Sequence, residues 1–302
     1  MGWLLGQVAD ILDGFLDWVA KAILACFEAM ISAIAHTLLI TPDVTGLPQV
    51  QALTGRSTWI VDTVFVLAFI AAGVLVMVAG GDERARFTVK DLLPRLVVGF
   101  IAAHFSQLLC GQAIAVANGL TQALSSTGYS DAGALEAIGT HVRAGAESGL
   151  PVLLFVIIAL LITVLLAATF FSLIVRFSTL LVLTAVAPLA LACHALPQTD
   201  PLARLWWRSY AGCLAIPVLQ AMTLQAGQWM LLDPRQMLPV IGLPGEPGAV
   251  INLFIVMVLL WYTVRIPGLV GRLVSQGGGG RPGILGMIVR VVFVQRAVRA
   301  VT

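Results

Sequence analysis

The sequence predicts an all-α, polytopic transmembrane helical protein, and two observations support this prediction. The first is composition, because 59% of the 302 residues are hydrophobic and 11% are charged, against roughly 45–50% and about 25% in soluble domains. The second is that the apolar residues form nearly uncharged runs of about 20 residues, the length of a helix that crosses a bilayer. These runs are continuously apolar rather than alternating, which favours helices over the strands of a barrel.

The N-terminal region, residues 1–58, begins with a helical pattern from residue 3 to residue 39. Its charged residues recur at spacings of three, four and seven and therefore share one helix face. They are Asp10, Asp13, Asp17, Lys21 and Glu28. We expect this segment to be an amphipathic helix at the membrane interface. Thr41 to Ser57, which contains two prolines and two glycines, is predicted to be a loop.

Residues 59–267 form the predicted transmembrane helical domain. Its first span runs from Trp59 to Gly80, with Trp59 as an interfacial anchor and Asp62 just inside the edge. The loop that follows, from Gly81 to Asp91, carries three basic residues, Arg84, Arg86 and Lys90. The second span runs from Leu92 to about Leu124.

A polar stretch, residues 125–149, separates the second span from an apolar tract that runs from Pro151 to Leu196. Residues 131–145 of this stretch are expected to form a short surface helix. The tract is too long for one straight span, because its 46 residues would extend about 69 Å as a helix. Proline removes a backbone donor, so we expect a break near Pro188. The segment 151–175 then crosses and 177–196 is re-entrant or steeply tilted, with a sixth full crossing as the alternative.

The rest of the chain predicts two more crossings and a basic tail. A polar segment, Pro197 to Arg208, precedes the apolar segments Ser209 to Leu232 and Ala249 to Tyr262. The final region, 268–302, combines a Gly-rich hinge with a basic helix that bears Arg290, Arg296 and Arg299.

Arginine distribution predicts the orientation of the protein in the membrane. Basic segments remain in the cytoplasm, so the six arginines from Arg265 to Arg299 place the C-terminus inside. Alternation back along the chain places the loop 125–149 and the N-terminus outside. The sequence therefore predicts about five net crossings, a broken or re-entrant segment, and an interfacial N-terminal helix.

One stripe of polar and small residues lies within the second span. Its members recur at helical spacing and share one side of the helix: His104, Gln107, Gly111, Asn118 and Gln122. Polar groups in lipid are costly unless partnered, so the stripe should face protein or water. It is either a helix or subunit contact or the lining of a conduit. A proton relay is disfavoured, because no second titratable group is visibly paired with His104.

Two charged residues lie inside predicted spans, and each has two interpretations. Asp62 is either a functional intramembrane carboxylate or a residue that caps the helix or reaches the interface. Arg176 is either a paired charge within the bundle or the cytoplasmic boundary of a span. The signatures of common enzyme classes, such as HExxH and GxSxG, are absent. The sequence therefore predicts no catalytic residues, no metal and no cofactor.

A stretch from Leu181 to Leu224 carries a family resemblance in four elements. They are Ala187-Pro188-Leu189, Pro197-Gln198-Thr199, Arg204-Leu205-Trp206-Trp207-Arg208, and Val218-Leu219-Gln220. The chain resembles the TrbL-like polytopic inner-membrane subunits of conjugation and type IV secretion systems. The remaining spans agree with that family in order and hydropathy.

The resemblance implies a non-catalytic subunit of a DNA or protein translocation machine in the bacterial cytoplasmic membrane. Such a subunit would form a homo-oligomer around a conduit, together with other secretion subunits and ATPases, and would touch the translocated DNA or protein transiently. The basic tail and the segment Arg204 to Arg208, with Trp206 and Trp207, would contact lipid or a partner. The alternative is a stand-alone transporter or channel for a small solute, which would show inverted repeats and paired broken helices.

Overall fold

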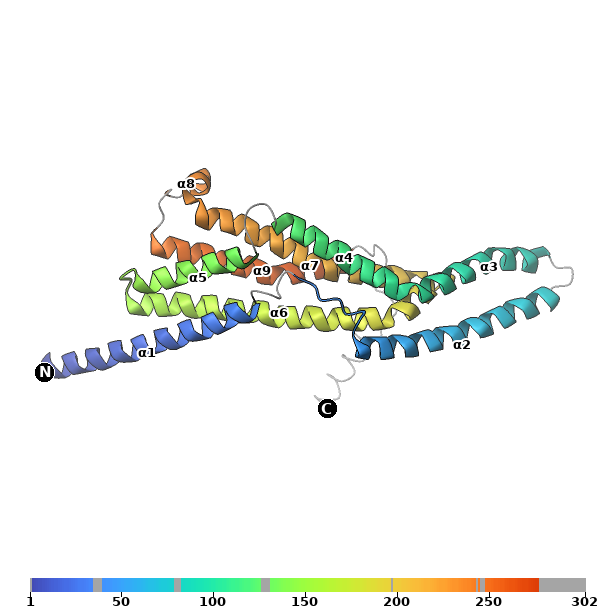
Figure 1. Cartoon of the computed structure of the whole chain (residues 1–302), viewed down its shortest axis with the longest axis horizontal. Coiled ribbons are helices and arrows are strands. Elements are labelled where there is room, and N and C mark those ends of the chain that lie inside the picture. The colour runs from blue at the N-terminus through green and yellow to red at the C-terminus, as the bar shows by residue number, and fades with distance from the viewer. Residues whose placement is uncertain are drawn as a thin grey trace, which may run out of the picture.

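A computed structural model describes residues 2–34, 40–78, 83–125, 131–196, 198–242, 244 and 248–276. These residues are mostly helical, and the molecule is elongated (Figure 1). The α-helices are α1 (Gly2–Ile34), α2 (Pro48–Val78), α3 (Glu83–His104), α4 (Ser106–Ser125), α5 (Asp131–Glu147), α6 (Val152–Ala192), α7 (Asp200–Leu232), α8 (Pro234–Met237) and α9 (Ala249–Gln276). Two 3₁₀ turns, η1 (Cys193–Ala195) and η2 (Leu238–Ile241), follow α6 and α8. The all-α prediction is confirmed for the described residues.

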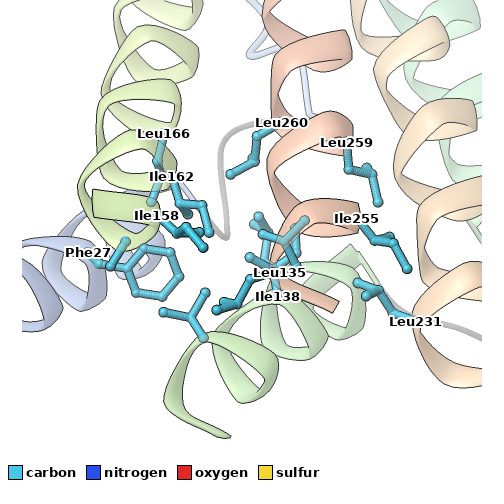
Figure 2. Packing of buried hydrophobic residues seen from close by; sticks show 14 of the residues in the cluster. Phe27, Leu135, Ile138, Ile158, Ile162, Leu166, Leu231, Ile255, Leu259 and Leu260 are labelled. Carbon is cyan, nitrogen blue, oxygen red and sulfur yellow. The ribbon is translucent and has the colours of Figure 1, made fainter. Parts of the chain in front are cut away.

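The centre of the molecule is a bundle of long helices, α6, α7 and α9, capped by α5 at one end (Figure 1). Its largest core consists mainly of branched aliphatic side chains from α1, α5, α6, α7 and α9, together with aromatic rings such as Phe27, as Figure 2 shows. Ile162 and Leu166 of α6 and Leu253 of α9 are completely buried there. Gly227 lies where α7 approaches α9, since a Cβ at this position would meet the side chain of Leu259.

The N-terminal helix α1 is only partly covered by the bundle. Phe27 and Ile34 in its second half are buried against α6, and the guanidinium of Arg143 on α5 lies 2.9 Å from the carboxylate of Glu28. The first half extends away from the bundle and exposes Phe15 and Trp18 (Figure 1). An amphipathic helix with an exposed aromatic face is what the sequence predicts, and its place at a membrane interface stays a prediction.

Helices α2 and α3 form an antiparallel hairpin that projects beyond the end of α6; we call it the arm (Figure 1). The arm is joined to the bundle at Gly99, whose position beside η1 leaves no room for a side chain. A Cβ on Gly99 would lie 2.8 Å from the Cβ of Ala195 and 3.0 Å from its backbone nitrogen. Glycine is therefore required where the arm meets the bundle.

Within the part of the chain that the structure describes, length and hydropathy identify three helices that could cross a membrane: Pro48–Ala71, Val152–Ala195 and Ala249–Val274. A fourth candidate is the bent pair Pro94–His104 and Ser106–Leu124. Five crossings would also require α7, whose apolar part carries three glutamines. These glutamines, Gln220, Gln225 and Gln228, are buried among other helices. Polar side chains of this kind lower the hydropathy of a helix without exposing it to lipid.

Three boundaries differ from the sequence prediction. Residues 48–57 are not a loop, because α2 begins at Pro48, and proline suits the first turn of a helix. The basic segment before the second span is helical from Glu83. The second span itself is not one helix: α3 and α4 meet at Phe105 with a bend of 61°. The predicted domain boundaries at 58/59 and 267/268 fall inside α2 and α9.

The predicted break at Pro188 is wrong, because α6 continues through this residue to Ala192. Proline leaves one backbone carbonyl without its helical donor, four residues earlier, at Thr184. A side chain from another helix takes the place of that donor, as described below. The helix consequently remains continuous and ends at Ala192, four residues beyond the proline, where η1 follows.

The short helix expected in the polar stretch is observed as α5, and its place at the membrane surface stays a prediction. Three of its apolar side chains, Leu135, Ile138 and Val142, are buried in the main core. The predicted hinge and the basic helix with Arg290, Arg296 and Arg299 lie outside the described residues.

Candidate functional site: a polar notch where the arm meets the bundle

Polar side chains gather in a hollow of about 500 Å³ where α2 passes α4. We call this hollow the polar notch. Its lining residues are Gln51, Thr54, Gly55, Thr58, Trp59, Asp62 and Gln107. The notch lies at the foot of the arm, beside the bend between α3 and α4. Polar groups on a segment that crosses a membrane require protein or water around them.

The imidazole of His104 and the carboxylate of Asp62 form a pair at the rim of the notch. Nε2 of His104 lies 3.2 Å from Oδ1 of Asp62, and both side chains remain more than a third exposed. Asp62 thus has a partner on another helix, which neither the capping nor the interfacial interpretation includes. The expectation that no titratable group is paired with His104 is wrong, because the partner comes from α2, which no spacing within the second span reveals.

The second ring nitrogen of His104 contacts the backbone of its own helix. Nδ1 lies 3.0 Å from the carbonyl oxygen of Phe100, which can only accept, so Nδ1 donates the hydrogen in this contact. The contact orients the imidazole ring so that Nε2 faces Asp62 on α2.

Gln107 connects three helices through its side-chain amide. Its Nε2 donates to the carbonyl oxygen of Thr184 at 3.1 Å and to Oγ1 of Thr54 at 3.2 Å. The Thr184 carbonyl is the one that Pro188 leaves without a backbone donor. Gln107 therefore satisfies the polar group that the proline exposes, and this contact explains why α6 does not break.

A glutamine also contacts the carbonyl that a second proline leaves without a donor, between α7 and α9. Pro267 in α9 leaves the carbonyl of Thr263 without its helical donor. Nε2 of Gln220 on α7 lies 3.5 Å from that oxygen, at the long limit for a hydrogen bond. Both cases combine Thr-x-x-x-Pro on one helix with a buried or half-buried glutamine on another. The glutamine of the Val218-Leu219-Gln220 element thus has a structural role.

The rest of the polar stripe lies on α4 and mainly contacts the N-terminal part of this same chain. Asn118 forms two hydrogen bonds with the backbone of Thr41, one accepted by Oδ1 at 2.9 Å and one donated by Nδ2 at 2.8 Å. Gly111 lies beside Thr45, and Gln122 is exposed. The bend after α3 separates His104 from the other four, so the five residues do not share one helix face.

The turn between α6 and α7 contains the other elements of the family resemblance. Oγ1 of Thr199 donates to the carbonyl of Cys193 at 2.8 Å, and Asp200 lies 2.7 Å from His194 and 2.6 Å from Arg204. The hydrogen bond from His194 and the charge of Arg204 hold the pKa of the Asp200 carboxyl below its ordinary value. These contacts fix the direction in which α7 leaves the turn.

Two of the predicted lipid or partner contacts differ in exposure. Trp206 is 5% exposed, stacks on Tyr210 and donates its indole N–H to the carbonyl of Leu183 at 2.9 Å. The prediction of a surface contact is wrong for Trp206, because its neighbours on α6 supply both apolar cover and an acceptor. Trp207 is half-buried, whereas Arg204 and Arg208 are exposed and available to lipid or to a partner.

The prediction of a loop over residues 41–57 conceals the polar residues that precede Asp62 on α2. Gln51, Thr54, Thr58 and Asp62 recur at spacings of three, four and four, which places them on one face of a helix. This pattern becomes visible once α2 is extended back to Pro48. Among the described residues, no group of three histidine, cysteine, aspartate or glutamate side chains could hold a metal ion.

These features define a multi-pass helical membrane protein whose polar side chains connect its helices. A family model described as TrbL/VirB6 plasmid conjugal transfer like protein matches residues 1–273. The chain belongs to this family of conjugal transfer membrane proteins, and the predicted resemblance is confirmed. Comparison with curated proteins and with solved structures gave no match.

Proposed function

We propose that the chain is a non-catalytic inner-membrane subunit of a conjugative or type IV secretion channel, and that copies of it assemble around the conduit. The family match over residues 1–273 supports a place in such an apparatus and favours it over a stand-alone solute transporter. Other secretion subunits and their ATPases are the expected partners. Translocated DNA or protein would contact the assembly transiently.

The observation that carries the assembly proposal is the exposed Asp62–His104 pair on a poorly covered arm. Only 17% of the residues in the apolar window of α2 are buried, against 44% in α6. A polar, titratable pair on such a surface is stabilised when a second protein or a water-filled wall covers it. We therefore assign the polar notch to a subunit interface or to the wall of the conduit.

The proposed topology places five crossings in the membrane, with α7 as the fifth. The arginines from Arg265 to Arg299 would be cytoplasmic, and α5 and the N-terminus extracytoplasmic. In this arrangement the three predicted regions remain an interfacial N-terminal segment, a membrane domain and a basic cytoplasmic tail. Single cysteines at 88, 140 and 236, in a variant without the four native cysteines, test it. Labelling of position 88 from outside the cell would contradict it.

Photocrosslinking tests whether the notch faces another component of the channel. A photoreactive residue at Thr58 lies in the notch, whereas the same residue at Val64, about 120° away around α2, is exposed and does not line the notch. In cells with an active transfer system, position 58 is expected to crosslink to a second copy of the chain or to the transferred DNA. Crosslinks to these components from position 64 alone would assign the contact to the other face and remove the proposal for the notch.

Deletion of the gene tests the functional class itself. In a host that carries the complete transfer system, deletion is expected to abolish transfer, and expression of the intact chain is expected to restore it. A variant with Asp62→Leu should fail to restore transfer, whereas Thr63→Ala, a change at an exposed neighbour, should restore it. Normal transfer in the deletion strain would contradict the proposal.

A further inference from the structure

A groove of about 530 Å³ lies between α6, α7 and α9, and its lining residues all belong to these three helices rather than to α2 and α4, which line the polar notch. Its floor is buried and includes Gly212 and Cys213 of α7. Its rim is exposed and includes Phe171 and Val175 of α6 and Gly271 of α9. The groove is therefore open along its length to whatever surrounds the bundle.

At the floor of the groove, α7 and α9 approach each other closely at a glycine. A Cβ on Gly212 would lie 2.6 Å from Cγ2 of Val274 and 3.2 Å from Cγ1 of Val270. On the opposite wall, Sγ of Cys213 lies 3.6 Å from the backbone oxygen of Arg176. These contacts place Arg176 at the same level of the bundle as the close approach of α7 and α9 at Gly212.

Arg176 is the charged residue that lines the groove, and its side chain is 93% buried, leaving 7% exposed. The same residue also borders a second hollow, which Ile40 and Pro42 help to line, so Arg176 contributes to both cavities. A guanidinium has five N–H donors and can hold an anion in addition to contacts within the chain. Hydroxyl groups of Ser172, Thr179 and Ser209 also line the groove.

The remaining lining is apolar, which restricts the class of ligand. Phe171, Val175, Ile216, Val264, Val270 and Val274 form walls that a hydrated anion would not favour. A ligand that fits both parts has an anionic head that the guanidinium can bind and a hydrocarbon chain that can lie along the walls. A volume of about 530 Å³ falls within the range of roughly 300–1,000 Å³ that is typical of ligand sites.

We propose that this groove binds a phospholipid, with the lipid phosphate on Arg176 and an acyl chain between α6 and α9. The exposed arginines Arg208 and Arg272, which are adjacent in sequence to the lining residues Ser209 and Gly271, add positive charge near the mouth of the groove. Basic pockets between membrane helices bind anionic lipid heads for this electrostatic reason. The site is separate from the polar notch and does not depend on the proposed channel function.

Native mass spectrometry of the purified full chain in mild detergent tests the site with three probes. Phosphatidylglycerol carries both parts of the ligand, diacylglycerol carries the chains without phosphate, and glycerol 3-phosphate carries the phosphate without chains. Phosphatidylglycerol is expected to bind, and the other two are expected to bind at least about fivefold more weakly, the effect of one charge contact. Equal binding of diacylglycerol would exclude a role for Arg176, and equal binding of glycerol 3-phosphate would exclude a lipid site.

Two variants separate the site from the stability of the fold. Arg176→Gln is expected to remove the preference for phosphatidylglycerol over diacylglycerol. Gly271→Leu leaves Arg176 intact and places a side chain in the groove, where a Cβ meets no atom within 4 Å, and it should reduce binding of phosphatidylglycerol. Gly268→Leu is the matched control, because Gly268 is also open but does not line the groove. Undiminished binding in the Gly271→Leu variant, or equal losses in both leucine variants, would overturn the proposal.

Discussion

The bundle and the arm are both built from apolar helices, yet they differ in what covers them. In α6 and α9, 44% and 39% of the residues in the apolar window are buried within the chain, whereas in α2 the share is 17%. The polar groups follow the same division. Gln220 in the bundle is 3% exposed and contacts another helix, but the Asp62–His104 pair on the arm remains accessible. The length of an apolar helix thus does not show whether the same chain covers it or whether it exposes a surface to another molecule.

Substitution at Gly99, where the arm meets the bundle, is expected to give the largest effect on stability. Gly99→Leu is expected to separate α3 from η1, because its Cβ would lie 3.0 Å or less from the Cβ and the backbone nitrogen of Ala195, and backbone cannot rotate away. Overpacking of this kind lowers the free energy of unfolding by about 3 kcal/mol. Unfolding in mixed micelles, followed by tryptophan fluorescence, measures the loss.

Gly73→Leu on α2 is the matched control for Gly99→Leu, since a Cβ there meets no atom within 4 Å. It should unfold within about 0.5 kcal/mol of the original chain, as surface substitutions usually do. If Gly99→Leu were equally mild, the arm would not be fixed to the bundle at this point, and its direction relative to the bundle would be open.

The contact between Gln107 and Pro188 gives the next largest effect. Gln107→Leu leaves the Thr184 carbonyl without a donor and should lower the free energy of unfolding by about 1 kcal/mol. Pro188→Ala restores a backbone N–H that can donate to that carbonyl. The cost of Gln107→Leu should therefore be smaller when Pro188 is already alanine. Equal costs in the two backgrounds would show that Gln107 does not act through the carbonyl that the proline frees.

The same contact explains which parts of the fold could be predicted from the sequence. Hydropathy predicts the long helices and their order, because membrane insertion depends on a property that each segment carries alone. The effect of Pro188 could not be predicted in this way, since it depends on a glutamine 81 residues earlier in the chain. The proline considered within its own helix predicts a break. The helix remains continuous because Gln107, on another helix, donates to the freed carbonyl of Thr184.

The candidate site shows a similar limit. The stripe that contains His104 and Gln107 was visible as a spacing pattern, and these residues do line or border the polar notch. Their partners, Asp62 and Thr54, lie on α2 and could not be assigned without knowing which helices are neighbours. The prediction for Trp206 is wrong for a related reason. A tryptophan beside arginines resembles an interfacial anchor, and only the fold shows its neighbours in the core.

The two ends of α7 differ in their response to pH, and the larger response is expected at the end near α5. Burial lowers the pKa of His141, and contact with the backbone of Leu231 opposes this only in part. The unfolded chain takes up a proton near pH 6.5, which the folded chain resists. Stability should therefore fall as the pH decreases through about 6.5. Thermal unfolding in detergent between pH 8 and 5 should show a smaller decrease for His141→Gln than for the original chain.

The other end of α7 should respond later and less. The pKa of Asp200 is lowered by His194 and Arg204, so its contribution to stability is complete above about pH 4, the value for an unfolded aspartate, and is lost as the pH falls through the lower folded value. Asp200→Asn should lower the thermal unfolding midpoint at pH 7 slightly, and this deficit should shrink as the pH falls through the lowered pKa and the original carboxyl becomes protonated as well. His141→Gln is the comparison over the same pH range, because its effect develops near pH 6.5. A variant of Asp200 whose deficit grew on acidification would show that the carboxylate does not stabilise the turn.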